Sequence, residues 1–445
     1  MFKARICMHY IWLILLTPLA LSSADFNLTV AAPAQPAAPM RLGLVTLGTI
    51  DERLSCLADQ LARDLELSGQ FKLEVREGTP TITSVAELKA FSQQQLPLVI
   101  FLDFTDQQKS EICWRLYDTV NAKMLVGKRI RYQHLKCKHL AHEIAMQAWQ
   151  ALTGQSSSFK TVIAACRREP QAGGKYAQHI YAFHITDNLT SSAPHAPRCL
   201  VAAPTINLAP RFHPQRPLLY YSQQTVRNVR LMALNRRGQN QIVADFNGLN
   251  LTPAIAPQGT TVLTLTWEGK SRLCRYTTTA GRGKYQSLTG PEIHAMTPQF
   301  IDQNRILLCA INTKHLPRIA IYDLRTQTLD YLSGHQYAVS PAYCPANQQL
   351  VYCQKVAGVQ QLFMGQLTSN HTVAQLRQLT FGKGDKDNPC WSPCGTYLIY
   401  SEETAQQSRL CLYNGVTQQT HYLTPAGAWW CFPVWSPVYL EIPFI

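Results

Sequence analysis

After residue 24 the sequence lacks any hydrophobic run long enough to cross a bilayer, and it also lacks the common motifs of catalysis and nucleotide binding. The G-x-S-x-G nucleophile elbow, the Walker phosphate loop and the G-x-G-x-x-G dinucleotide fingerprint are all missing. His142 and Glu143 resemble the start of a zinc-protease motif, but Met146 stands where the second histidine is required. We therefore predict no catalytic residue, no cofactor and no metal site, and a protein that is not an enzyme.

Basic residues outnumber acidic ones, but they do not form a cluster. The chain has 41 lysines and arginines against 27 aspartates and glutamates, a formal net charge of +14. No cluster of five or more basic residues occurs, which argues against nucleic acid as a partner. An acidic protein partner or an acidic cell-envelope surface fits this charge better.

Residues 1–24 have the composition of a secretory signal. A basic start with Lys3 and Arg5 precedes an apolar stretch, and a small-residue cleavage site ends at Ala24. The competing interpretation is a transmembrane anchor. The apolar stretch contains Pro18 and falls short of the ~20 residues that a spanning helix needs. We therefore expect cleavage after Ala24 and an exported, soluble protein without a transmembrane span.

The cysteine content is high, and its role is left open by the sequence. Removal of Cys7 with the signal leaves 13 of the 14 cysteines, an odd number. An oxidising compartment permits disulfides, but their connectivity cannot be derived from spacing. Several cysteines, such as Cys274 and Cys309, stand in strand-like runs and are expected to be small buried hydrophobes. Cys390 and Cys394 have no second pair at zinc spacing.

A short phrase returns six times in the second half of the chain. It reads APRFHP (209–214), TPAIAPQG (252–259), TPQFIDQN (297–304), SPAYCPAN (340–347), NPCWSPCG (388–395) and FPVWSP (432–437). The leading prolines stand at positions 210, 253, 298, 341, 389 and 433, so the steps are 43, 45, 43, 48 and 44 residues. A period of about 40–45 residues in strand-rich units is typical of propeller blades.

The repeating unit has room for four strands. We expect the leading proline at the first position of a short inner strand, followed two residues later by a large apolar residue. Two β-like runs and a short closing segment follow in most units, for example LVYCQ (350–354), QLFMGQL (361–367) and QLTFG (378–382). The sixth unit is too short for a blade, and strand-like runs at 159–166 and 179–185 precede the first phrase. The sequence predicts a six-bladed β-propeller over residues 159–445, closed by strands from both ends.

The region before the propeller has a mixed pattern. Residues 41–155 alternate strand-like and helix-like segments, with helices expected at 52–67, 84–91 and 134–152. The predicted fold class is therefore α+β multidomain, a small α/β domain followed by the propeller. Residues 25–40 form a separate segment, a short strand-like stretch on an alanine- and proline-rich linker. A lone strand of this kind docks on its own protein or adds to the sheet of a partner.

Several motifs together resemble the TolB family of the Tol–Pal system. FPVWSPVYL (432–440) is similar to the family's F-P-A-W-S-P ending, and SGQF (68–71) follows the first helix as it does in the family. The junction AHEIAMQAWQALTG (141–154) leading into FKTVIA (159–164) is similar to the family's helix and first propeller strand. The resemblance covers essentially the whole mature chain. The aspartate of the family's S-P-D-G turn is absent from every unit, with Cys394 and Gln258 in two of these places.

The resemblance implies a non-enzymatic periplasmic scaffold that binds the lipoprotein Pal and TolA, maintains outer-membrane integrity and supports cell division. It would be peripheral to the outer membrane through these partners. The family's Pal face is built partly from the segments before each leading proline, which we expect here to be loops at one mouth of the ring. The candidate Pal-binding residues are Leu249, Asn250, Thr252, His294, Met296, His335, Asp385, Asp387 and Asn388. The candidate TolA-binding segment is Asp25, Phe26, Asn27, Leu28, Thr29 and Val30.

Two alternatives from other classes stay open at this point. The first is a periplasmic peptidase or hydrolase with a propeller that gates access to a catalytic domain. The small amino-terminal domain and the missing nucleophile elbow argue against it. The second is a propeller that binds a sugar or another small ligand in its channel. A pulldown from envelope extract separates a protein partner from a small ligand.

Overall fold

The structure is a computed structural model of the 445-residue chain. It describes residues 38–47, 52–77, 84–105, 108–132, 137–186, 197–251, 253–256, 258–267, 269–279, 282–311, 316–334 and 336–437. The expected signal sequence, the segment from 25 to 37 and the strand-like run VYLEI (438–442) lie outside the described residues.

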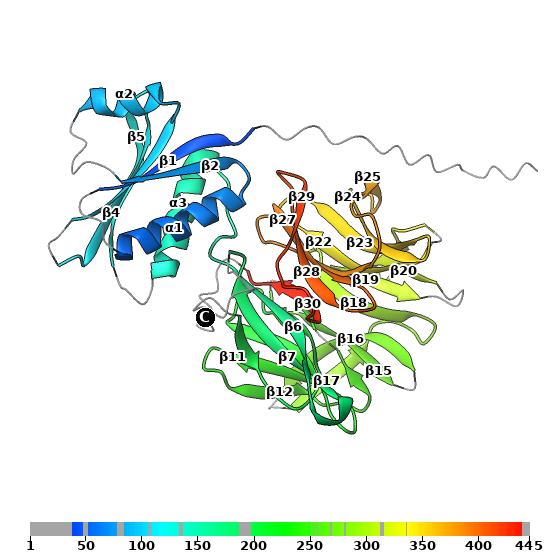
Figure 1. Ribbon diagram of the computed structural model, residues 1–445. Coiled ribbons are helices and arrows are strands. Elements are labelled where there is room, and N and C mark those ends of the chain that lie inside the picture. Colours follow the sequence, from blue (N-terminus) through cyan, green and yellow to red (C-terminus); the bar gives the residue numbers. More distant parts are fainter. Residues whose placement is uncertain are drawn as a thin grey trace, which may run out of the picture. The chain divides into compact units, whose positions relative to one another are not determined.

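The amino-terminal α/β region is built on one five-stranded sheet in the order β2-β1-β3-β4-β5 (Figure 1). Strand β1 pairs in parallel with β2 and β3, and β3, β4 and β5 are antiparallel. The strands are β1 (Met40–Thr46), β2 (Phe71–Glu77), β3 (Leu98–Phe104), β4 (Glu111–Asp118) and β5 (Lys123–Arg131). The helices are α1 (Glu52–Leu67), α2 (Val85–Gln93) and α3 (Cys137–Thr153). These elements confirm the alternation of strands and helices predicted from the sequence.

The helices form where the apolar spacing and the capping residues favour them. Helix α1 buries Leu54, Leu57, Leu61 and Leu65, which lie three or four residues apart on one face. Helix α2 begins with a capping box, in which the Ser84 hydroxyl accepts a hydrogen bond from the Glu87 backbone N–H and the Glu87 carboxylate accepts one from Ser84.

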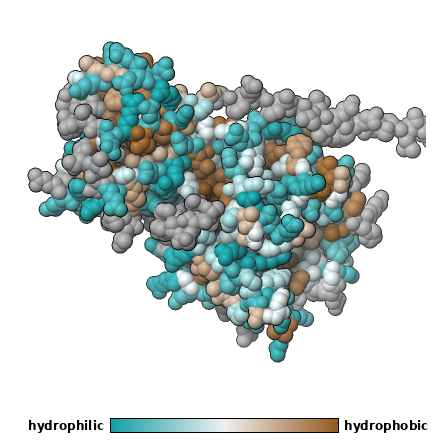
Figure 2. Space-filling view, in the orientation of Figure 1, coloured by the Kyte–Doolittle hydropathy of each residue, from teal (hydrophilic) through white to brown (hydrophobic). Residues whose placement is uncertain are grey.

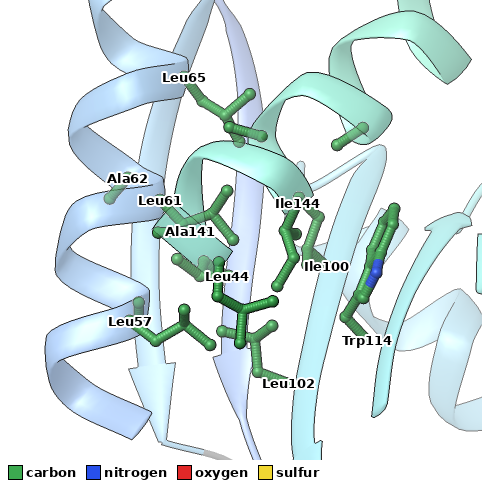
Figure 3. Close-up of a cluster of buried hydrophobic side chains, with 14 of the residues drawn as sticks. Leu44, Leu57, Leu61, Ala62, Leu65, Ile100, Leu102, Trp114, Ala141 and Ile144 are labelled. Atoms are coloured by element: carbon green, nitrogen blue, oxygen red, sulfur yellow. The ribbon is translucent and has the colours of Figure 1, made fainter. Parts of the chain in front are cut away.

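Helices α1 and α3 pack on one face of the sheet and close its main core. Figure 3 shows side chains of α1 and α3 meeting those of the central strands, with Leu44, Ile100 and Trp114 among the labelled residues. All three of these strand residues are fully buried. Burial of this apolar area is the main stabilising term for the region.

The remaining strands form the propeller, whose sheets each contain antiparallel strands (Figure 1). Three sheets have four consecutive strands: β18 (His294–Phe300), β19 (Arg305–Ile311), β20 (Pro317–Asp323) and β21 (Leu329–Tyr331); β22 (Ala338–Cys344), β23 (Gln349–Val356), β24 (Val359–Leu367) and β25 (Val373–Gln378); and β26 (Asp385–Trp391), β27 (Tyr397–Glu403), β28 (Ser408–Asn414) and β29 (Gln419–Tyr422). The second and third strands of these sheets confirm the predicted β-like runs.

One sheet takes its strands from both ends of the propeller region. Its order is β30-β6-β7-β8, with β30 (Trp430–Trp435), β6 (Val162–Pro170), β7 (Tyr176–His184) and β8 (Arg198–Val201). Strand β30 pairs antiparallel with β6, so that Trp435 lies opposite Ile163. The Ser436 hydroxyl also accepts a hydrogen bond of 2.8 Å from the Val162 backbone N–H.

A nine-stranded sheet holds the strands between β8 and β18. These are β9 (Asn207–Phe212), β10 (Leu218–Gln224), β11 (Val229–Asn235), β12 (Asn240–Ala244), β13 (Leu249–Asn250), β14 (Ala254–Ile255), β15 (Thr261–Trp267), β16 (Lys270–Thr279) and β17 (Arg282–Ser287). Its two halves are joined by a single parallel pair, Val229 with Leu249. Isolated parallel bridges of the same kind connect Gln178 with Ile206 and Ser408 with Trp429.

The repeated proline lies at a β-bulge inside the inner strand, and our expectation that it starts the strand is wrong. In β9, β18, β22, β26 and β30 the register shifts around the proline. The residue before the proline has a left-handed backbone in each of these strands: Ala209, Thr297, Ser340, Asn388 and Phe432, with φ between 47° and 52°. A bulge leaves a residue outside the ladder, so it tolerates proline, which has no N–H to donate.

Left-handed backbone at these bulges costs conformational energy, which glycine would relieve. Thr297 is exposed and β-branched, with φ of 49°. We expect Thr297→Gly to raise the free energy of unfolding by about 0.5–1 kcal/mol, because the cost of left-handed backbone exceeds the entropy that glycine adds to the unfolded chain. Thr277→Gly is the control, since this exposed strand residue is not left-handed. The Thr277→Gly variant should be less stable than the parent. If thermal unfolding shows that both variants change stability in the same direction, the expectation is contradicted.

A buried polar cluster joins α1, α3 and the segment after β7. The Asp64 carboxylate lies 2.6 Å from His142 Nδ1 and accepts hydrogen bonds from Gln60 Nε2 at 3.0 Å and from the Thr186 hydroxyl at 3.2 Å. Asp64 and His142 are almost completely buried, and the His142 ring lies 4.7 Å from the ring of His184. The cluster therefore ties both helices to the propeller.

The end of α1 makes a second contact with the propeller. The Asn414 side chain, at the end of β28, donates hydrogen bonds to the backbone oxygens of Leu67 at 2.9 Å and Ser68 at 3.3 Å. Gly69 follows with φ of 73°, and a Cβ there would lie 2.1 Å from Thr417 Cγ2. Glycine is required here by both the backbone and the close approach.

Candidate functional site

The segments before the repeat prolines are inner strands over much of their length, so our expectation of loops is wrong for most candidate residues. Leu249 and Asn250 form β13, His294 and Met296 lie on β18, and Asp385, Asp387 and Asn388 lie on β26. The chain pairs before the bulge as well as after it, because the bulge interrupts the ladder without ending it. Thr252, His335 and the segment from Asp25 to Val30 lie outside the described residues.

The distance of a residue from the repeat proline decides on which side of the inner strand its side chain lies. The third residue before the proline is buried in every unit: Asn207, Asn250, Ala295, Ala338, Lys386 and Trp430, each at most 2% exposed. The fourth residue before the proline points to the opposite side, since side chains alternate along a strand. We call these fourth residues the rim positions: Ile206, Leu249, His294, Tyr337, Asp385 and Trp429.

Asn250 is buried, so the structure contradicts its assignment as a partner contact. Its Nδ2 donates to the backbone oxygens of Val229 and Phe246, each at 2.7 Å, and its Oδ1 accepts from the Phe246 N–H at 3.0 Å. Buried polar groups are satisfied within the fold. Asn250 thus holds the preceding turn.

Lys386 shows the same internal use of a polar side chain. It is 2% exposed, and its ammonium donates to the backbone oxygens of Phe381, Lys383 and Gly384 at 2.9 to 3.3 Å. The turn from 381 to 384 is therefore folded over the cation. Asp385 follows this turn and is the first residue of β26.

The two aspartates on β26 have different surroundings. Asp385 is exposed, and its carboxylate accepts a hydrogen bond of 2.7 Å from the Gln360 N–H on β24. Asp387 is half-buried and accepts from the Ser340 hydroxyl at 2.6 Å and from the Asn388 N–H at 2.7 Å. Asp387 therefore links β26 to β22, and its charge cannot be reversed without breaking this link. Of the two, Asp385 is the carboxylate available to a partner.

Only three of the six rim positions were named by the sequence analysis. Leu249, His294 and Asp385 were named, and Leu249 is 40% exposed. Ile206, Tyr337 and Trp429 were missed. Lys355 Nζ lies 4.8 Å from the ring centre of Tyr337, and the Arg168 guanidinium carbon lies 4.6 Å from the ring centre of Trp429. Counting four residues back from every repeat proline would have found all six.

The inner strands are also connected after the bulge. Gln299 on β18 donates to the Tyr343 backbone oxygen at 2.8 Å and accepts from the Tyr343 N–H at 2.9 Å on β22. Cys390 Sγ on β26 accepts from the Trp435 N–H at 3.3 Å on β30. Arg211 stands at the equivalent place on β9, where burial lowers the pKa of its guanidinium. These contacts hold neighbouring inner strands at a fixed spacing and so fix the rim.

A cavity of about 440 Å³ lies between the end of α1 and the outer strands of the sheet that begins with β26. It is lined by Ala38, Pro39, Glu66, Leu67, Gly69, Phe71, Lys72, Leu412, Asn414, Thr417, Gln419 and His421. The first described residues of the chain, Ala38 and Pro39, thus pass along this cavity before entering β1.

Two findings about the described residues concern metal ions and membrane-spanning helices. Among them, no three side chains of His, Cys, Asp or Glu are grouped so as to hold a metal ion. No helix within the same residues is long and apolar enough to cross a bilayer. On the face shown in Figure 2, hydrophilic residues predominate and hydrophobic ones form small separate groups.

Comparisons with known proteins identify related sequences. Residues 149–439 match the family described as the TolB beta propeller domain. A Tol-Pal system protein TolB from Nitrosococcus oceani is 30% identical over 141 residues, which cover 32% of this chain and 31% of the relative. Another Tol-Pal system protein TolB, from Acinetobacter baylyi, is 25% identical over 233 residues, or 51% of each chain. The matched part of the chain thus spans from about a third to half the length of these relatives.

A solved structure shows the same fold over nearly the whole chain. The crystal structure of TolB from Acinetobacter baumannii superposes with a TM-score of 0.75 and covers 91% of this chain and 98% of the other. Its sequence identity is 16%, so this likeness concerns the fold. A TolB-like β-propeller preceded by an α/β region is therefore the architecture of the chain. None of these three TolB proteins carries the name of an enzyme.

Proposed function

The chain belongs to the family of the TolB beta propeller domain, and from this we propose that it is a non-enzymatic periplasmic scaffold of a Tol–Pal system. In this role it binds a Pal-like lipoprotein and TolA, and so maintains outer-membrane integrity and supports cell division. The observation that carries the proposal is the match of residues 149–439 to that family, together with relatives named as Tol-Pal system proteins.

We infer that the propeller has six blades. Four blades are separate four-stranded sheets, and the nine-stranded sheet holds two more, β9 to β12 and β13 to β17. Among the described residues, Val229 with Leu249 is the single strand pairing between them, and two isolated parallel bridges of the same kind occur elsewhere in the propeller. An apolar cluster that includes Leu231 and Leu263 packs between the two halves, as clusters do between the other neighbouring sheets.

We divide the chain accordingly into a signal peptide at 1–24, a segment with TolA-binding strand and linker at 25–40, an α/β domain at 41–155 and a propeller at 159–445. The α/β region lacks the size and motifs of a hydrolase, and the proposed role needs none. The segment from Asp25 to Val30 precedes Ala38, which lines the cavity beside α1.

The rim positions form the proposed Pal-binding surface. Each blade delivers one of these side chains at the same distance from its repeat proline, so several contacts converge on one rounded partner. Aromatic residues such as Tyr337 and Trp429 are the residue types that dominate binding energy in protein interfaces. Asp385 adds a carboxylate that is open to the partner.

The test is calorimetry of the full chain against the Pal homologue from the same source. We expect Asp385→Lys and Trp429→Ala each to weaken binding by roughly ten-fold or more, because each removes or reverses a rim contact. Asp387 is left unchanged, since its link to Ser340 is structural.

Ile242→Ser provides the matched control. Ile242 is 49% exposed on β12, the outermost strand of its unit, and this variant should bind like the parent. Parent protein that does not bind the Pal homologue would overturn the proposed function. Binding by the parent with unchanged affinity in both rim variants would place the partner elsewhere on the protein.

A further inference from the structure

Two cysteines of the α/β region lie with their sulfurs in contact. Cys56 is the fifth residue of α1, Cys137 is the first residue of α3, and their Sγ atoms are 3.3 Å apart. Cys56 is exposed to solvent, whereas Cys137 is buried. Among the 13 cysteines that the structure describes, no other two sulfurs come within hydrogen-bonding distance.

The geometry is close to that of a covalent link. A disulfide has an S–S bond of about 2.0 Å and joins residues whose side chains face each other. Both cysteines lie near the amino-terminal ends of helices α1 and α3, which pack against each other on the same face of the sheet. Closure therefore needs a shift of the sulfurs by roughly 1 Å, which side-chain rotation supplies.

We propose that Cys56 and Cys137 form a dithiol that closes to a disulfide by exchange with an external disulfide. The partner class is any accessible disulfide, either a small molecule or a protein oxidant. The site stands apart from the rim positions and does not depend on the proposed binding function.

The exposed thiol reacts first. The Cys56 thiolate attacks one sulfur of the external disulfide, forms a mixed disulfide and releases one external thiol. The Cys137 sulfur, after losing its proton, then attacks Cys56 Sγ, and the second external thiol leaves. Two protein thiols are oxidised and one external disulfide is reduced to two thiols, so atoms and electrons balance.

Burial of Cys137 makes the rate of the second step depend on pH. Desolvation, reinforced by the neighbouring Cys56 thiol, raises the pKa of Cys137 to about 12. The Cys137 thiolate is therefore scarce at neutral pH, and closure should accelerate as the pH rises. The exposed Cys56 can meet a bulky oxidant, which the buried Cys137 cannot.

The closed disulfide would constrain most of the α/β region. The loop from residue 56 to residue 137 contains β2, α2, β3, β4 and β5. Cross-linking a long loop stabilises a fold mainly by restricting the unfolded chain. The link would also clamp α1 to α3 near the buried pair of Asp64 and His142.

The experiment equilibrates the full chain with glutathione disulfide, blocks free thiols with an alkylating agent and maps linked peptides by mass spectrometry. We expect a peptide pair joined through Cys56 and Cys137. Thermal unfolding of the oxidised protein should occur roughly 4–10 °C above that of the reduced protein. Reduction with dithiothreitol should reverse the shift.

Three variants make the result decisive. Cys56→Ser and Cys137→Ser should each lose the linked peptide and the redox-dependent shift, and Cys56→Ser is at an exposed position that tolerates serine. Cys199→Ser removes another exposed thiol and should keep both signals. Full alkylation of Cys56 and Cys137 after equilibration, or a Cys56 that remains linked to glutathione, would overturn the proposal.

Discussion

Replacing Asp64 by alanine is expected to lower the free energy of unfolding by about 3–5 kcal/mol, because it removes one partner of a buried pair. The carboxylate is completely buried, and it is the common acceptor for His142 of α3, Gln60 of α1 and Thr186 after β7. Without it, the buried His142 ring loses this contact and the Thr186 hydroxyl loses its acceptor, whereas Gln60 Nε2 keeps its hydrogen bond of 2.9 Å to the Thr186 hydroxyl. Chemical denaturation followed by circular dichroism measures the loss.

Two further variants separate this effect from a general weakening of α1. Asp59→Ala changes an exposed aspartate on the same helix and should alter stability by no more than about 0.5 kcal/mol. The double variant Asp64→Ala with His142→Ala should lose less than the sum of the single losses, because the two side chains share one interaction. Equal losses from Asp59→Ala and Asp64→Ala would show that the buried cluster is not the cause.

Trp430→Ala is expected to cost about 3–5 kcal/mol and to open the sheet that contains both ends of the propeller region. Trp430 is 1% exposed, and its ring meets those of Tyr181 and Phe183 edge to face at centroid distances of 5.6 and 6.1 Å. The cavity left by alanine lies in the apolar cluster between this sheet and strands β27 and β28. Hydrogen exchange should therefore increase first in β6 and β7 and only later in β22 to β25.

The adjacent tryptophan supplies the control. Trp429 is only partly buried and its ring stacks with the Arg168 guanidinium, so Trp429→Ala should cost less than about 1 kcal/mol. A Trp430→Ala protein whose exchange rises equally in every blade would indicate global loss of stability rather than opening of this sheet.

Much of the architecture could be predicted because each element carries a local signal. The spacing of leucines in α1 and the Ser84 cap of α2 depend only on neighbouring residues, and the structure confirms both helices. The strand runs of the propeller are equally local. Their repetition about every 45 residues then identified the kind of fold, and the family match confirms a TolB-like propeller.

The bulge could not be predicted in the same way. Apart from Asn388, the left-handed residues before the repeat prolines, such as Ala209, Thr297 and Phe432, are not the glycines or asparagines that usually indicate left-handed backbone. The surrounding ladder imposes that conformation on them. A proline alone is compatible with a strand start, a loop or a bulge. From the sequence we chose the strand start and therefore missed the bulge.

The sequence indicated which positions belong to the candidate site, but it did not indicate which of their side chains are buried and which are exposed. Asn250 and Leu249 are neighbours in the sequence, but one is buried among backbone partners and the other is 40% exposed. Strand alternation separates them, and the register that decides the direction comes from pairing with residues far along the chain. For the same reason, spacing gave no hint of the contact between Cys56 and Cys137, which 81 positions (137 − 56) separate.

The pairing of β30 with β6 has a consequence for the synthesis of the protein. Strand β6 ends at Pro170 and β30 begins at Trp430, so the ribosome adds 260 residues (430 − 170) after Pro170 to reach Trp430. At roughly 5–20 residues per second this takes about 13–50 s. During that time one edge of β6 has no partner, because β30 has not yet been synthesised. A chain that stops before Trp430 would keep that edge open, ready to pair with another nascent chain.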